Sequence, residues 1–279
     1  MTTPPLDELV QNYLEWLKNI KCAPYQTFRA YQVDLIHFLK YFLHLEQTNI
    51  PSKNEIEEYL ATMKSKYNYS SYRRKVTVLR NFTRYLIESG INVSDPFISI
   101  TLPMPEINFN LPLQYEDVLN LIDSLSENTS REIRDKLIFS LIAKSGLTIK
   151  QLLSLKIKDI NLATNQIIVS RNQLTFVDAK TSLLLKEYFS KINEISQVSL
   201  NDYLICTRDI PHHASKNIKL PLSTRSINLI IDKTAKKMDF KARLSPTILR
   251  RSFAKSLKEK NINQATKELI FGKKCRLVG

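Results

Sequence analysis

The sequence predicts a mainly α-helical protein with a small antiparallel sheet, arranged as two domains. Apolar residues recur at intervals of three and four over most of the chain, as they do along the buried face of a helix. Two short β-type runs, residues 165–169 and 174–177, have the composition and spacing of a hairpin. A proline-rich stretch over residues 103–112 interrupts the helical pattern and is expected to form a stiff linker. We therefore place one domain over residues 1–102 and the other over residues 113–279.

Four helices are expected in the first domain. Apolar stripes predict helices that begin near Leu6, after Thr27, after Ser52 and at Ser71. Thr27 is well placed to cap the second helix, because its hydroxyl can accept a bond from a backbone N–H of the first turn. Gly90 stands at a position suited to positive φ, so the fourth helix is expected to end just before it.

The fourth helix has an apolar face and a basic face. Val78, Leu79, Phe82 and Leu86 share the apolar face. A basic face can be merely solvated, but Glu88 is the only acid in this helix, which favours contact with phosphate groups. The residues that we expect to contact DNA from this helix are Arg73, Arg74, Lys75, Arg80 and Arg84.

The second domain is expected to contain six helices around the predicted hairpin. In the last of them, Ser245 is suited to the N-cap and Pro246 to the first helical position. The predicted helices span residues 115–125, 131–144, 149–155, 181–193, 223–237 and 246–260.

The charge balance points to a polyanionic partner. The chain has 41 lysines and arginines against 27 acids, a net charge of +14. Such an excess attracts nucleic acid, because basic residues on phosphates release condensed counterions. No apolar run approaches the ~20 residues that a membrane span needs. The N-terminus lacks the pattern of a signal peptide. We therefore expect a cytoplasmic, nucleoid-associated protein without a membrane partner.

Neither a metal site nor a cofactor is expected. Cys22, Cys206 and Cys275 are far apart in the chain, and no CxxC pair occurs. The four histidines are better explained as core or surface residues than as zinc ligands.

Several segments of the second domain resemble the signature motifs of the tyrosine recombinases, the phage-integrase and Xer family. Residues 244–254, LSPTILRRSFA, resemble the second motif, L-S-P-H-x-L-R-H-S-F-A. Residues 145–155, SGLTIKQLLSL, are similar to the first motif, T-G-L-R-x-S-E-L-x-x-L, but lack its arginine. Residues 131–137, REIRDKL, are similar to the family's L-R-D-K-A run. Residues 270–273, IFGK, resemble the third motif, L-L-G-H.

The resemblance implies the two-domain architecture of this family. The first domain would be the helical, SAM-like core-binding domain, and the second a catalytic-type domain that is degenerate and truncated at its C-terminus. The family needs no metal: a tyrosine attacks the scissile phosphate and forms a 3′-phosphotyrosyl link. By family spacing that tyrosine would fall three residues beyond Gly279.

Position by position, the resemblance implies a weakened catalytic site. The family's first arginine falls on Thr148, and its second-motif histidine on Thr247. Its second arginine is kept as Arg250, a cation that can neutralise charge on phosphate oxygens. Arg171 stands near the position of the family's lysine, and Lys273 at that of the third-motif histidine. A guanidinium is a poor proton donor, so Arg171 does not replace a lysine well.

DNA contact is expected to be better preserved than chemistry in the second domain. Arg251, Lys255 and Lys258 fall on one face of the helix predicted over residues 246–260, and Arg243 stands just before it.

Three functions remain open from the sequence. The first is an integrase-like protein that holds duplex DNA between its two domains without cutting it alone. The second is an active site-specific recombinase that uses a partner's tyrosine or a non-standard one, with Tyr188 and Tyr203 as candidates. The third is a protein-interaction module on the recombinase scaffold. The expected partner is double-stranded DNA; a catalytic recombinase homologue and a homo-oligomer on DNA are the further assemblies considered.

Overall fold

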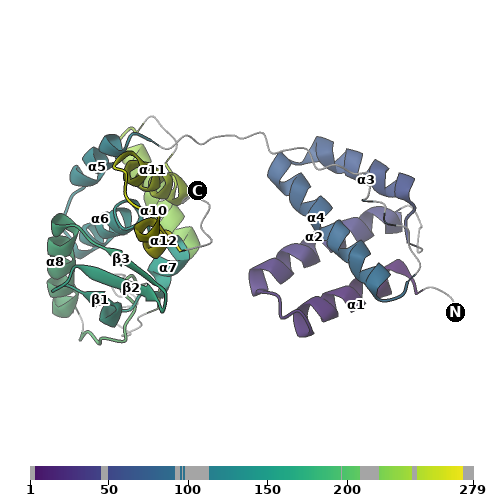
Figure 1. Ribbon diagram of the computed structural model, residues 1–279, viewed down its shortest axis with the longest axis horizontal. Helices are drawn as coiled ribbons and strands as arrows, with labels where there is room; N and C mark the ends of the chain where they lie inside the picture. The colour runs from purple at the N-terminus through teal and green to yellow at the C-terminus, as the bar shows by residue number, and fades with distance from the viewer. Residues whose placement is uncertain are drawn as a thin grey trace. The chain divides into compact units, whose positions relative to one another are not determined.

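The computed structural model divides into two compact units, Met1–Asn108 and Phe109–Gly279 (Figure 1). The predicted linker over residues 103–112 lies outside the described residues. The structure describes residues 4–44, 50–91, 95, 97, 113–195, 197–207, 220–240 and 244–272.

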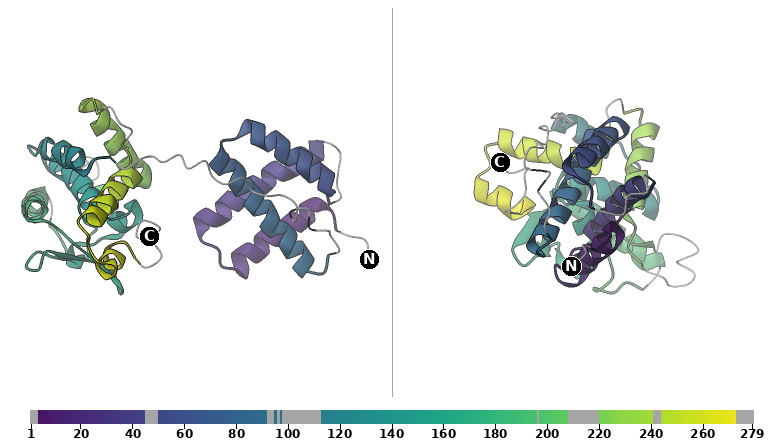
Figure 2. Two further views of the ribbon diagram at one scale, coloured as in Figure 1. Left: turned by 45° about the horizontal axis from the view of Figure 1, so that its top comes forward. Right: turned by 90° about the vertical axis from the view of Figure 1, so that its right-hand side faces the viewer.

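The described residues of unit 1 form four helices. The left view of Figure 2 shows that these helices cross one another. The fourth helix packs against each of the other three. Its apolar face, including Val78 and Phe82, joins one core with Tyr13 of the first helix and Phe38 of the second. The helices are α1 (Leu6–Asn19), α2 (Tyr25–His44), α3 (Lys53–Lys66) and α4 (Tyr69–Glu88), which confirms the four predicted helices.

The helix ends of unit 1 follow local side-chain chemistry. Ser52 caps α3 in a capping box, in which its backbone N–H donates to the Glu55 carboxylate over 2.6 Å. Asn68 caps α4 by accepting from the backbone N–H of Ser71 over 3.0 Å, so α4 begins two residues before the predicted start. The prediction that Thr27 caps α2 is wrong. The helix begins at Tyr25, and the Pro24 carbonyl accepts its first helical bond from Phe28.

Unit 2 surrounds one nearly fully buried helix, α6. From Ile133 to Ala143 every α6 residue is buried except Asp135, and α6 contacts α5, α7, α8, α10 and α11. The helices are α5 (Tyr115–Asp123), α6 (Ser130–Ala143), α7 (Ile149–Ser154), α8 (Ala179–Ile195), α10 (Thr224–Lys237), α11 (Pro246–Glu259) and α12 (Gln264–Phe271). The six predicted helices are confirmed, as are Ser245 at the N-cap of α11 and Pro246 at its first position.

The sheet of unit 2 is antiparallel, with strand order β1-β2-β3. Its strands are β1 (Ile160–Asn161), β2 (Gln166–Ser170) and β3 (Gln173–Phe176). The predicted hairpin is confirmed: Ser170 pairs with Gln173, so Arg171 and Asn172 form a two-residue turn. Within the described residues, three short elements were not predicted: η1, a 3₁₀ helix over Ile157–Asp159; β1, which is only two residues long; and α12, an eight-residue helix whose end overlaps the third motif.

A small apolar cluster joins α11 to α12 and closes over Gly146. Its buried members are Phe253 and Ala254 of α11 with Ile270 and Phe271 of α12. Gly146 has φ +70°, and a Cβ atom built there would lie 2.7 Å from a ring carbon of Phe271. Only glycine combines this backbone angle with so close an approach. This cluster brings the first and second sequence motifs together.

Among the described residues, no helix combines the length and the apolar character required to cross a membrane.

Candidate functional site

Thr148, at the position of the family's first arginine, is a helix cap in this structure. Its Oγ1 accepts a hydrogen bond from the backbone N–H of Gln151 over 3.2 Å. Oγ1 and the backbone N–H of Thr148 both donate to Oε1 of Gln151, each over 2.9 Å. This is a capping box in which glutamine takes the place of the usual glutamate. The hydroxyl therefore serves the start of α7 and brings no charge to the site.

Gln151 is the first member of an amide relay that sequence reasoning missed. Its Nε2 donates to Oε1 of Gln173 over 2.9 Å, and Nε2 of Gln173 donates to the Ile270 carbonyl over 2.6 Å. The relay, defined as Thr148, Gln151, Gln173 and the Ile270 carbonyl, ties α7 and β3 to the end of α12. The one available signal was that Gln151 stands where the first motif has its glutamate. Nothing local marks Gln173, which is 97 residues from Ile270.

Arg250, the retained arginine, is anchored on the main chain. Its Nε donates to the Gly146 carbonyl over 2.6 Å, and Nη2 donates to the Phe271 carbonyl over 3.4 Å. Its Cζ lies 5.0 Å from the centre of the Phe271 ring, a cation–π arrangement. The side chain is half-buried. These contacts hold the guanidinium between the first motif and the end of α12.

No hydrogen bond or ion pair of the described residues joins the other predicted catalytic residues, Arg171 and Thr247, to Arg250 or to the amide relay. Arg171 is exposed in the turn between β2 and β3. Thr247 is exposed in the first turn of α11. Lys273 lies outside the described residues.

The tyrosines of unit 2 are engaged in the fold. Tyr188 is fully buried and donates to the Leu204 carbonyl over 3.2 Å, so its candidacy as a nucleophile is wrong. Tyr203 is half-buried, with Nζ of Lys156 lying 5.8 Å from its ring centre. The sequence analysis did not consider Tyr115, whose ring centre lies 6.0 Å from that of Phe253 of α11, with the two rings tilted by 35°. Its hydroxyl donates to the Ala143 carbonyl over 3.2 Å, and burial raises the pKa of this phenol, which weakens it as a nucleophile.

The basic face of α4 is the second candidate site. Arg73 and Arg84 are exposed. Arg80 is half-buried, and its Cζ lies 5.9 Å from the ring centre of Phe97. Exposed guanidinium groups can pair with the phosphate oxygens of a nucleic acid.

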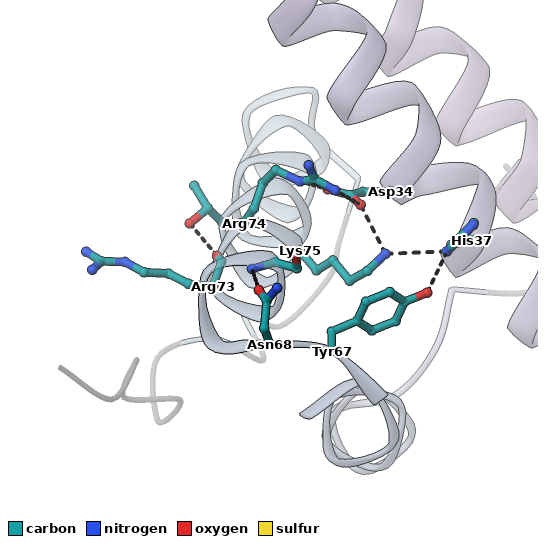
Figure 3. Close-up of polar contacts among 9 residues, drawn as sticks. Asp34, His37, Tyr67, Asn68, Arg73, Arg74 and Lys75 are labelled. Atoms are coloured by element: carbon teal, nitrogen blue, oxygen red, sulfur yellow. Dashed lines mark hydrogen bonds and ion pairs between the residues drawn. The ribbon is translucent and has the colours of Figure 1, made fainter. Parts of the chain in front are cut away.

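Lys75 does not belong to this face, which corrects the sequence prediction. Its side chain is only 2% exposed, and Nζ donates to Oδ1 of Asp34 over 3.0 Å. The same ammonium lies 3.5 Å from Nδ1 of His37 and 4.7 Å from the ring centre of Tyr67 (Figure 3). Nδ1 of His37 is also 3.3 Å from the Tyr67 hydroxyl. Lys75 is thus enclosed between α4 and α2 and cannot contact a phosphate.

Arg74 shares the Asp34 carboxylate with Lys75. Its Nε donates to Oδ2 over 2.8 Å and its Nη2 to Oδ1 over 3.0 Å, a bidentate pair. Asp34 is buried, whereas the Arg74 side chain is 49% exposed. Hydrogen bonding to Asp34 raises the pKa of Arg74, so the guanidinium remains charged. We call Asp34, Arg74 and Lys75 the charge triad.

The basic residues predicted on α11 are unequally exposed. Lys258 is exposed, and Arg251 is half-buried. Lys255 is half-buried and lies 3.5 Å from Glu259, a surface ion pair of little energetic weight. Arg243 lies outside the described residues.

Comparison with protein families identifies both parts of the chain. Residues 112–272 match the model described as the phage integrase family. Residues 10–90 match the phage integrase N-terminal SAM-like domain. A tyrosine recombinase of Agathobacter rectalis is 27% identical over 270 residues, which cover 91% of this chain and 84% of the relative. The tyrosine recombinase XerC of Lactobacillus leichmannii is 26% identical, with coverage of 89% and 84%.

Solved structures share the fold. The Tn1549 transposon integrase, in complex with circular intermediate DNA, superposes with a TM-score of 0.74 at 16% identity, covering 98% of this chain and 93% of the integrase chain. The recombinase XerH, bound to its difH substrate before cleavage, gives a TM-score of 0.71 at 18% identity, with coverage of 97% and 79%. Since the phage integrase model spans more than half of the sequence, this chain belongs to the phage integrase family of tyrosine recombinases, whose members act in DNA recombination and integration.

Proposed function

We propose that this protein is a DNA-binding member of its family that binds duplex DNA and does not cleave it by itself. The observation that carries the proposal is a contrast between the two candidate sites. The catalytic-type site has Thr148 in place of an arginine and an Arg250 anchored on the main chain. The basic face of α4 keeps Arg73 and Arg84 exposed.

The charge of the molecule supports DNA as the partner. The net charge of +14 and the exposed arginines of α4 suit a phosphate backbone. Lys258 and Arg251 of α11 offer further cations in the second domain. The Tn1549 integrase and XerH, which share the fold, were both solved in complex with DNA. We assign α4 in the domain over residues 1–102 and α11 in the domain over residues 113–279 as the DNA-contacting helices.

The amide relay supports the loss of chemistry. A phosphoryl-transfer site must neutralise charge that builds on the non-bridging oxygens. Here the residues around the first-arginine position are Thr148, Gln151 and Gln173, all uncharged. By analogy with the loss of one donor from an oxyanion hole, one missing phosphate ligand lowers the rate by about 10²–10³-fold.

The protein is expected to bind a nicked duplex without forming a covalent adduct. The test uses radiolabelled nicked duplexes carrying sequences from the flanks of its own gene, resolved on native and denaturing gels in parallel. A native shift that disappears under denaturation is the expected result. A band that survives denaturation would show that cleavage occurs, and mass spectrometry of that band would identify the nucleophile.

Removing two α4 charges is expected to weaken DNA binding at every sequence. In the double variant Arg73→Gln, Arg84→Gln, the slope of log affinity against log salt should fall by about 1.8, since each phosphate contact contributes roughly 0.9. Fluorescence anisotropy with labelled duplexes across a salt series measures this slope. The matched control is Lys18→Gln, Lys64→Gln, which removes the same charge from exposed positions of α1 and α3. If the slope fell equally in the two double variants, the assignment of α4 as a DNA-contacting helix would be contradicted.

A further inference from the structure

The charge triad has one more positive than negative charge, and the excess lies on its exposed member. One carboxylate, Asp34, faces two cations, and Lys75 is buried beside it. The triad therefore keeps one net positive charge, and only Arg74 presents it to solvent. The Arg74 guanidinium is thus the group of the triad that attracts an electron-rich ligand.

The orientation of Arg74 is fixed by the way in which Asp34 binds it. A guanidinium has five N–H donors in a planar fork. Asp34 takes the edge formed by Nε and Nη2, over 2.8 and 3.0 Å. This leaves the end-on edge, formed by Nη1 and the second N–H of Nη2, directed away from the carboxylate. Two parallel donors at this edge match a pair of neighbouring acceptors rather than a single point charge.

The surroundings of Arg74 leave room for a ligand. A hollow of about 380 Å³ elsewhere, in unit 2, is bordered by lysines already paired with acids. The hollow beside Arg74 is about 300 Å³ and is lined by Arg73, Arg74, Ser70, Thr77, Tyr31 and Val78. This hollow borders both arginines, and the surface that lines it is mainly apolar.

The neighbouring arginine has a different geometry. Figure 3 shows the Arg73 side chain extended away from the charge triad, whereas the Arg74 side chain lies against Asp34. An extended, exposed arginine can follow a phosphate in many positions. An arginine held in place by a carboxylate can pair only with a ligand whose acceptor atoms face its remaining edge. Such a fixed geometry is required for reading a base.

We propose that Arg74, clamped by Asp34, reads a guanine in the major groove of the DNA target, while Arg73 contacts phosphate. Guanine presents O6 and N7 as adjacent acceptors in that groove, and a bidentate arginine is the commonest specific contact to them. The inference rests on the proposed DNA-binding function and adds a specificity-determining residue to it. Asp34 acts as a positioning residue, because it touches Arg74 and not the DNA.

The test is a selection of binding sites from a randomised duplex library with the full chain. Three proteins are compared: wild type, Arg74→Lys, and Arg73→Lys as the matched control. Lysine keeps the positive charge but lacks the fork, so Arg74→Lys should retain its salt dependence. We expect Arg74→Lys to lose the preference for guanine at one position and to bind the wild-type consensus roughly 5- to 150-fold more weakly. Arg73→Lys should select the wild-type consensus.

A second measurement changes the DNA and uses the same proteins. Replacing the assigned guanine by 7-deazaguanine removes the N7 acceptor, so wild-type affinity should fall while that of Arg74→Lys should not fall further. An unchanged consensus for Arg74→Lys, an unchanged wild-type affinity for the 7-deazaguanine duplex, or selection of no consensus by wild type would each overturn the assignment of Arg74. If wild type bound no duplex at low salt, the proposed function itself would fail.

Discussion

Replacing Gly146 by alanine is expected to lower the free energy of unfolding of the second domain by roughly 2–6 kcal/mol. Two costs combine. A non-glycine residue held at φ +70° is strained by about 1–3 kcal/mol. The added Cβ would also lie 2.7 Å from Phe271 and 3.2 Å from Phe253, and overpacking of this kind costs about 1–3 kcal/mol.

Gly272→Ala is the matched control for this prediction. Gly272 has φ +86°, but the nearest atom to a Cβ there would be Oε1 of Gln173 at 3.7 Å, an ordinary contact. The control therefore carries the backbone strain without the clash. Urea unfolding followed by circular dichroism compares the two variants with wild type. Equal destabilisation by the two variants would show that the ring of Phe271 moves aside freely.

Replacing Asp34 by asparagine is expected to destabilise the first domain by about 3–5 kcal/mol. The substitution preserves the volume of the side chain but leaves the Lys75 ammonium buried without its counter-charge. Removing one partner of a buried ion pair is costly because the remaining charge stays away from water.

The only tryptophan of the chain, Trp16, provides the measurement for Asp34→Asn. It lies in α1 with its ring centre 5.1 Å from that of Tyr85, so its fluorescence reports unfolding of the first domain alone. The control is Glu58→Gln, which neutralises an exposed acid of α3 and should change the free energy of unfolding by less than about 0.5 kcal/mol. An unfolding midpoint shared by all three proteins would contradict a structural role for the charge triad.

The helices were predictable because their signals are local. Ser245 and Pro246 are adjacent and mark the start of α11: Ser245 is its N-cap and Pro246 its first helical residue. Thr27 failed as a cap because Pro24 already supplies the carbonyl that begins α2, which places Thr27 inside the first turn. Helix α12 has only eight residues, so its apolar pattern is too short to be distinguished from that of the preceding helix.

The candidate sites were less predictable because they depend on contacts across the chain. Helical spacing places Lys75 beside Arg74 at the edge of the basic face, and only the position of Asp34, 41 residues earlier, decides that Lys75 is buried. Arg250 could be identified by its motif, but its bond to the Gly146 carbonyl spans 104 residues. Gln173 had no motif at all and was found only through its partners.

The amide relay has one consequence for the conditions under which this molecule works. Its hydroxyl, amide and carbonyl groups carry no ionisable proton in the range of biological pH. Acidification therefore leaves the hydrogen bonds of the relay unaltered, and dissolved ions have no charge within the relay to screen. The two candidate sites thus differ in kind: the basic face of α4 responds to its ionic surroundings, whereas the bonds of the amide relay do not depend on charge.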